Sequence, residues 1–257
     1  MNRHRYDNDT TVFSPQGRIF QVEYAMEAVK KGEVTVGLKN KDFTVLTSLY
    51  EPSDEGSMQR KIIPVHLQLG MTFAGVAPDA KTLCRYMLTQ ALTYRYSYIG
   101  EMPVHRLMIN LGNKMQAYTN RYDRRPFGAG LLVAGYDEQG SHLYQIMPSA
   151  TVTKCLATAI GSRSQIARNY LELHTQDFEG CSKDDLICHG IQAIREPLGN
   201  ENNLKIQVAI VGKDVQFKVF SEEETQKYLE TAKRMAANFE PAATDDLLSQ
   251  GSSDNIT

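Results

Sequence analysis

Alternating apolar and polar positions predict several β-strands in this chain. Three hairpins are expected, because paired runs of β-branched or aromatic residues flank short turns containing Gly, Asp or Asn. They cover residues 34–47, 131–146 and 206–220. A further strand is expected over residues 71–74, just before Gly75.

Apolar residues at three- and four-residue steps predict helices between these strands. Each predicted helix starts at a residue suited to a helix N-terminus. These starts are Asp79, Pro103, Ser162 or Ser164, and Ser182. Asp185 stands three residues after Ser182, the position of the acidic partner in a capping box.

Strand runs and helix runs are segregated along the chain, which is typical of antiparallel sheets covered by helices. We therefore expect an α+β fold, a four-layer helix–sheet–sheet–helix sandwich over residues 33–239. A chain of 257 residues is long enough to bury one large core. Residues 240–257 are acidic, contain no Lys or Arg, and are rich in Ser and Asp, so a disordered tail is expected there.

A short amphipathic helix is predicted near the amino terminus, within a separate segment of residues 1–32. Ser14 is a suitable N-cap, Pro15 a suitable first helical residue, and Gly32 a suitable C-terminal residue. One face of this helix is apolar and consists of Ile19, Val22, Met26 and Val29. Periodicity alone allows this face to pack either on its own domain or on a neighbouring molecule.

Charge and composition exclude several classes of function. Lys and Arg number 28 against 30 Asp and Glu, which argues against a nucleic-acid or anionic-membrane footprint. No apolar run approaches the roughly 20 residues needed to cross a bilayer, and the polar amino terminus does not predict a signal peptide. The four cysteines include no C-x-x-C pair, so reduced, isolated thiols are expected.

Common catalytic and ligand-binding motifs are missing from the sequence. It contains no G-x-S-x-G, H-E-x-x-H or Walker-type loop, and its six histidines are scattered. Three arginines lie within residues 121–125, but Tyr122, Asp123 and Pro126 interrupt them, which favours a solvated turn or a subunit contact over an anion site. We expect no cofactor and no metal site.

A long motif near the amino terminus resembles the signature of proteasome alpha subunits. It reads Phe-Ser-Pro-x-Gly-Arg-x-Phe-Gln-Val-Glu-Tyr-Ala-x-Glu-Ala over residues 13–28. Similar stretches recur at residues 75–80, 125–130, 135–137 and 159–165, so the resemblance runs from about Tyr6 to Phe220. Among the paralogues, the chain is most similar to the alpha type-1 (alpha-6) class. The resemblance implies the N-terminal nucleophile hydrolase type of sandwich.

The resemblance also implies that this subunit has no catalytic residues. Related beta subunits use a Thr freed as the mature first residue, whose own α-amine accepts the proton of its hydroxyl. The matching position here is Glu33, and Thr35 lies two residues further along. The acidic residue that supports the catalytic lysine of beta subunits is replaced by Leu49, so Lys61 alone makes no active site.

In the family, rings of seven alpha subunits flank inner beta rings and restrict entry to the axial pore. The resemblance assigns Tyr6, Asp7, Pro15 and Tyr24 to the gate-ordering cluster, and the helix from Pro15 to ring contacts. Asn8 replaces an arginine that alpha subunits often carry after Tyr-Asp, so a salt bridge through that arginine is not expected.

Lys61 matches the lysine of the pockets that receive the C-terminal carboxylate of an activator. The alternative is an ordinary surface lysine.

The implied partners are other alpha subunits, beta subunits, proteasome activators and the regulatory particle, and unfolded substrate passing the pore. The implied role is in ubiquitin-dependent protein degradation in the cytoplasm and nucleus. Two other functions stay open at this point. One is an active threonine peptidase, and the other is a free-standing interaction protein with the same fold.

Overall fold

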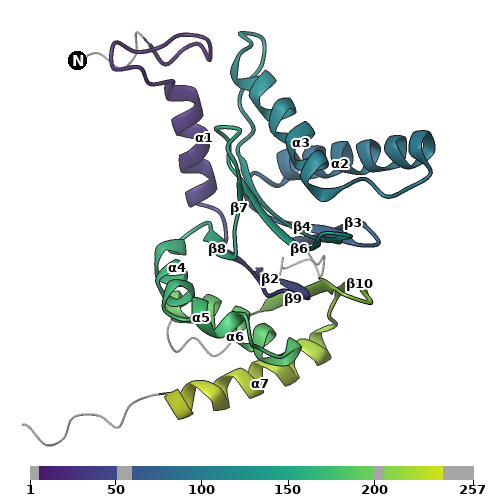
Figure 1. Ribbon diagram of the computed structural model, residues 1–257. Helices are drawn as coiled ribbons and strands as arrows, with labels where there is room; N and C mark the ends of the chain where they lie inside the picture. Colours follow the sequence, from purple (N-terminus) through teal and green to yellow (C-terminus); the bar gives the residue numbers. More distant parts are fainter. Residues whose placement is uncertain (1–5, 51–59, 199–204, 240–257) are drawn as a thin grey trace, which may run out of the picture.

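The computed structural model describes residues 6–50, 60–198 and 205–239, and its strands form two antiparallel five-stranded sheets (Figure 1). The first sheet has the order β10-β9-β2-β1-β8 and the second the order β3-β4-β5-β6-β7. The predicted tail over residues 240–257 lies outside the described residues.

The three predicted hairpins are confirmed. They are β1 (Thr35–Lys39) with β2 (Phe43–Leu49), β5 (Ala129–Asp137) with β6 (Gly140–Ile146), and β9 (Ile206–Gly212) with β10 (Val215–Val219). The predicted strand before Gly75 is β4 (Leu69–Gly75). Three shorter strands complete the sheets, namely β3 (Ile62–His66), β7 (Val152–Lys154) and β8 (Ala157–Ile160).

The helices cover the outer faces of both sheets, as Figure 1 shows. Helices α2 (Ala77–Tyr98) and α3 (Val104–Thr119) pack on the second sheet. Helices α4 (Ser164–Leu173), α6 (Lys183–Arg195) and α7 (Glu222–Phe239) pack on the first, with the short α5 (Thr175–Phe178) and the 3-10 turn Glu196–Leu198 between them. The predicted helix–sheet–sheet–helix sandwich is confirmed. No helix among the described residues is long and apolar enough to span a membrane.

Three apolar clusters fill the spaces between these layers. One lies between α4, α6, α7 and the first sheet, and a second between α2, α3 and the other sheet. The third lies between the two sheets and includes Val29, Leu46, Leu132 and Ile160. Burial of these continuous apolar faces is the main force that holds the layers together.

Helix starts show where local signals succeeded and where they failed. Ser182 caps α6, because its Oγ accepts a hydrogen bond from Asp185 N at 3.2 Å and donates one to Asp185 Oδ2 at 2.7 Å. At α2 the prediction was wrong, since Val76 is the N-cap and Asp79 lies in the first turn. Pro103 is the N-cap of α3 rather than part of its first turn, and Arg163 precedes the first residue of α4.

Candidate functional site

The segment before α1 (Phe20–Lys30) is hydrogen-bonded to that helix. The main-chain carbonyl of Asp7 accepts a hydrogen bond from Gln21 Nε2, and its carboxylate accepts one from Tyr24 Oη at 3.2 Å. Gln21 and Tyr24 lie three residues apart, so they share one face of the helix. The structure therefore brings together two residues of the predicted gate cluster, Asp7 and Tyr24. Tyr6, at the start of the described chain, is half-buried.

Pro15 lies in a tight turn, not in the helix. Gly17 N donates to the carbonyl of Ser14 at 2.8 Å, and Gly17 has a φ of +74°, which glycine adopts easily. Ser14 Oγ accepts from Arg18 N at 3.1 Å, so it serves this turn instead of capping a helix. The predicted start of the helix at Pro15 was thus wrong, and α1 begins at Phe20 after the N-cap Ile19.

A second anchor of the N-terminal segment involves Thr10. Its side chain is buried and its Oγ1 donates to the main-chain carbonyl of Arg121 at 2.6 Å, in the loop between α3 and β5. The two residues are 111 positions apart in the sequence. Sequence reasoning missed this contact, because a single hydroxyl at the end of a loop produces no periodic signal.

The four residues of the predicted ring-contact face do not share one environment. Val29 is 1% exposed and packs in the cluster between the two sheets, so it serves the chain's own core. Ile19, Val22 and Met26 are half-buried, and each keeps some accessible surface. The helix also buries Phe20 and Ala25. Packing on its own domain, the alternative that periodicity left open, thus accounts for part of the helix.

The position of the family's nucleophile is closed by main chain. Ser162 N donates to the carbonyl of Gly32 at 2.7 Å, and a Cβ added at Gly161 would lie 2.5 Å from the carbonyl oxygen of Glu33. Thr35 is fully buried inside β1, opposite Ser48 and Ile160. A threonine peptidase needs a Thr hydroxyl beside a free α-amine, and neither Glu33 nor Thr35 presents this arrangement.

Lys61 is only 8% exposed, so the alternative of an ordinary surface lysine is wrong for this chain. Its ammonium lies 5.2 Å from the centre of the Phe73 ring, a cation–π arrangement, and its main-chain N–H donates to Gln207 Oε1 at 3.0 Å. Gln207 also lines an open pocket of about 330 Å³ together with Arg60 and Tyr50. Leu49 is half-buried at the end of β2.

Sequence reasoning missed a polar link beneath the 121–125 loop. Arg125 donates from Nη1 and Nη2 to the two carboxylate oxygens of Asp79, at 2.6 and 2.9 Å, and Gly128 N donates to Asp79 Oδ2 at 2.8 Å. Arg121 and Arg124 instead lie near Asp123, at 3.1 and 3.7 Å. The family-like motif at residues 125–130 contains both Arg125 and Gly128, so it was the sequence feature that could have indicated their shared contact with Asp79.

Comparisons with known proteins agree with this geometry. A family model described as "Proteasome subunit" matches residues 29–211, and a second, which describes the N-terminal signature of the A-type proteasome subunit, matches residues 6–28. The chain is 54% identical over 240 residues to proteasome subunit alpha type-1 of Drosophila melanogaster, covering 91% of this chain and 86% of the relative.

Two further relatives are less similar in sequence. Proteasome subunit alpha type-1 of Dictyostelium discoideum is 47% identical, with 89% of this chain and 94% of the relative covered. Proteasome subunit alpha type-6 of Saccharomyces cerevisiae is 43% identical, with 89% of this chain and all of the relative covered. The predicted likeness to the alpha type-1 (alpha-6) class is therefore confirmed.

Proposed function

Because this chain belongs to the proteasome subunit family as an alpha-type member, we propose that it helps to control entry to the proteolytic chamber. It is a non-catalytic, structural subunit of the outer alpha ring of the 20S core, and it assembles with other alpha subunits and with beta subunits. The assembled particle acts as a threonine-type endopeptidase in ubiquitin-dependent protein degradation, in the cytoplasm and the nucleus.

One observation carries the non-catalytic role, namely Glu33 at the head of β1. A carboxylate there cannot replace the Thr hydroxyl, and the hydrogen bond from Ser162 to Gly32 keeps the preceding main chain in place. The chain is therefore expected to keep its amino-terminal segment attached to β1 in the mature particle.

Intact mass spectrometry combined with size-exclusion chromatography tests this function. We expect the chain to elute in a large complex and to retain residues 1–32. A mature form beginning at an internal Thr would instead support the threonine-peptidase alternative. A lone species of 28.9 kDa would support a free-standing interaction protein.

We assign gating to the segment before α1. Two sets of hydrogen bonds hold this segment. Asp7 accepts bonds from Gln21 and Tyr24 of α1, and Thr10 donates one to the loop between α3 and β5. Pro15 adds rigidity, since its ring fixes φ in the turn that precedes α1. A segment held in this way is ordered enough to cover a pore, yet few bonds must break to release it.

Replacing Tyr24 by Phe should partly open this gate. Phe keeps the aromatic ring and removes only the hydroxyl that donates to Asp7. A net loss of about 0.5–1 kcal/mol predicts a roughly threefold rise in peptide hydrolysis by the activator-free particle. Tyr98→Phe, which removes an exposed hydroxyl on α2, is the matched control. Equal rates for the two variants would contradict the role of Tyr24.

Ring assembly requires apolar side chains that stay exposed in the isolated chain. Ile19, Val22 and Met26 of α1 remain partly accessible, and we propose that neighbouring subunits bury them. A second stripe runs along α2 at four-residue steps, where Leu88, Leu92 and Tyr96 are 38%, 52% and 92% exposed. Apolar stripes of this kind are typical of assembly surfaces.

We propose that Lys61 contributes to activator docking. Its main-chain N–H is bonded to Gln207, which lines an open pocket together with Arg60. A terminal carboxylate in this pocket would meet the Arg60 side chain and the Gln207 amide, and it would also lie near Glu222 and Glu224. Because Lys61 is buried in the isolated chain, a carboxylate can reach its ammonium only by inserting below the protein surface.

Lys61→Met should weaken activator binding while the particle still assembles. Met keeps an apolar stem over Phe73 but removes the charge. Loss of one charge-assisted contact predicts a decrease in affinity on the order of tenfold, measured on purified particles with an activator's C-terminal peptide. Lys213→Met, at the exposed β9–β10 turn, is the control. Unchanged affinity in a complete particle would remove Lys61 from the docking site.

A further inference from the structure

Two histidines and two other aromatic side chains form a cluster between α4, α5 and α6. Tyr170 of α4 stacks on His174, which lies at the junction of α4 and α5, with ring centres 4.3 Å apart. His189 of α6 lies 5.5 Å from the His174 ring. Phe178 of α5 is 2% exposed and meets His189 edge-on at 5.4 Å. This aromatic cluster (Tyr170, His174, Phe178 and His189) therefore links the three helices.

The hydrogen bonds of the aromatic cluster suit an uncharged His189. His174 Nδ1 donates to the main-chain carbonyl of Tyr170 at 2.9 Å. His189 Nδ1 lies 3.0 Å from Tyr170 Oη, and a neutral imidazole can accept the proton of this hydroxyl. An imidazolium carries a proton on both nitrogens and can no longer accept one. Protonation of His189 therefore removes an acceptor from the Tyr170 hydroxyl.

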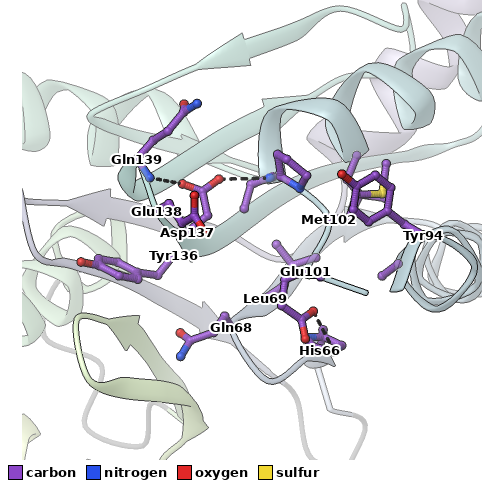
Figure 2. A pocket seen from close by; sticks show the side chains of 15 residues that line it. His66, Gln68, Leu69, Tyr94, Glu101, Met102, Tyr136, Asp137, Glu138 and Gln139 are labelled. Carbon is purple, nitrogen blue, oxygen red and sulfur yellow. Dashed lines mark hydrogen bonds and ion pairs between the residues drawn. The ribbon is translucent and has the colours of Figure 1, made fainter. Parts of the chain in front are cut away.

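Another histidine shows the arrangement that would stabilise an imidazolium. His66 lies 3.3 Å from the carboxylate of Glu101, in the pocket that Figure 2 shows. Within the described chain, neither His174 nor His189 makes an ion pair of this kind. A charge on His189 would thus lie among aromatic rings without a carboxylate in contact, which is costly in a half-buried position.

The neighbours of His189 act on its pKa in both directions. Burial lowers this pKa below its ordinary value, and His174 lowers it further. Asp177 on α5 and Asp185 on α6 raise it, but they do not outweigh burial. Further titratable groups around the cluster interact with Tyr170 and are Cys181, Cys188 and Glu196.

This direction determines how the stability of the cluster depends on pH. Because folding lowers the pKa of His189, the opened chain binds the proton more readily, near the ordinary pKa of about 6.5. The stability that the neutral ring contributes is fully present above pH 6.5. It is lost as the pH falls from about 6.5 toward the lower pKa of the folded chain.

Helix α5 depends on this cluster for its position. It has four residues, far fewer than a helix needs to be stable alone. Side-chain hydrogen bonds hold its two ends, from Thr175 Oγ1 to the carbonyl of Leu171 at 2.8 Å and from Asn40 Nδ2 to the carbonyl of Cys181 at 3.2 Å. Between these ends, Phe178 is the buried side chain of the helix. Loss of its contact with α6 would therefore loosen α5.

We propose that the aromatic cluster is an acid-sensitive latch, which holds α5 on α6 at neutral pH and releases it when His189 is protonated. Release exposes the Phe178 ring, an apolar surface that the outer helices otherwise cover. The latch lies in the helical layer on the first sheet, whereas α1 contacts β4 and β5 of the second sheet. It is therefore separate from the proposed gate.

Hydrogen exchange of the purified complex that contains the full chain tests this inference. Protection of peptides covering residues 171–182 is measured at pH 7.5 and 5.5, after correction for the intrinsic pH dependence of exchange. We expect protection to fall severalfold at pH 5.5, and at most about tenfold, the change that one pH unit below 6.5 permits for one proton. Peptides from α3 should show no comparable fall.

Substitutions assign the pH dependence to His189. In His189→Gln the amide oxygen can still accept a hydrogen bond but cannot be protonated, so protection should no longer change with pH. His105→Gln, at an exposed histidine of α3, is the matched control and should keep the wild-type dependence. The proposal is overturned if His189→Gln keeps the wild-type fall, if His105→Gln abolishes it, or if the fall in the wild type is absent or extends equally to α3.

The wild-type chain gives a second readout in case His189→Gln does not fold. Labelling with dithiodipyridine measures access to Cys181, which follows α5 and is half-buried. Cys84 on α2 is also half-buried and is the internal reference. The ratio of the Cys181 to the Cys84 labelling rate should rise severalfold between pH 7.5 and pH 5.5. A constant ratio would contradict release of α5.

Discussion

Gly75→Ala is expected to prevent the chain from folding stably. Gly75 has a φ of +102°, and a Cβ at this position would lie 2.3 Å from the carbonyl oxygen of Gly128. That carbonyl already accepts a hydrogen bond from Val76 N at 2.9 Å, so it cannot move away without losing a bond. Backbone strain and a collision with main chain together predict a loss on the order of 4 kcal/mol or more.

Gly17→Ala is the matched control for this effect. Gly17 also has a positive φ, +74°, but a Cβ there would meet no atom within 4 Å. Gly17→Ala should therefore lower the free energy of unfolding only by the cost of holding an alanine at a positive φ, about 1–2 kcal/mol. Urea unfolding of the full chain measures both losses, and soluble yield gives a second readout for a variant that does not fold. If Gly75→Ala and Gly17→Ala lower the free energy of unfolding by similar amounts, the collision with Gly128 does not contribute to the loss.

This glycine also determines where the N-terminal helix lies. The Cβ of an alanine at Gly75 would lie 3.3 Å from the Cα of Val29, and a Cβ at Gly32 would lie 2.1 Å from Gly75 N. The end of α1 therefore rests directly on the end of β4. Since α1 carries Gln21 and Tyr24, the bonds that hold the proposed gate depend on this close contact.

The hairpins and the cap of α6 could be predicted because their signals are local. Turn residues and alternation lie within a few positions of each other, as Ser182 and Asp185 do. Strand β3 was missed because Pro64 lies within it and weakens the pattern. The structure places β3 at the edge of its sheet, where proline is tolerated.

Contacts between distant parts of the chain could not be predicted from local patterns. Pairing of β2 with β9 joins residues such as Val45 and Ile210, and the register follows from the burial of both strands. The Ser14-Pro15 pair is a true turn signal, but Gly17 closes the turn before a helix can start. The family resemblance supplied the proposed roles of Tyr24 and Lys61, which no period or spacing could indicate.

Asp79→Ala should cause the second large loss of stability. Asp79 is 9% exposed, and its carboxylate accepts hydrogen bonds from Arg125 and from the buried Gly128 N–H. Removal of the carboxylate leaves this N–H without its partner, which predicts a loss of about 3 kcal/mol in urea unfolding at pH 7. Arg125→Met should cause a smaller loss, because Arg125 is exposed and the bond from Gly128 remains.

The loss should also depend on pH. Burial by itself raises the pKa of Asp79, but the hydrogen bonds from Arg125 and Gly128 outweigh burial and hold this pKa below its ordinary value. A pKa lowered by folding means that the carboxylate stabilises the chain above its unfolded pKa of about 4, and that this contribution is lost as the pH falls through the folded pKa. The difference between wild type and Asp79→Ala should therefore be largest near pH 7 and shrink in acid. A difference that stays constant down to pH 2 would mean that packing, not the ionised carboxylate, is responsible.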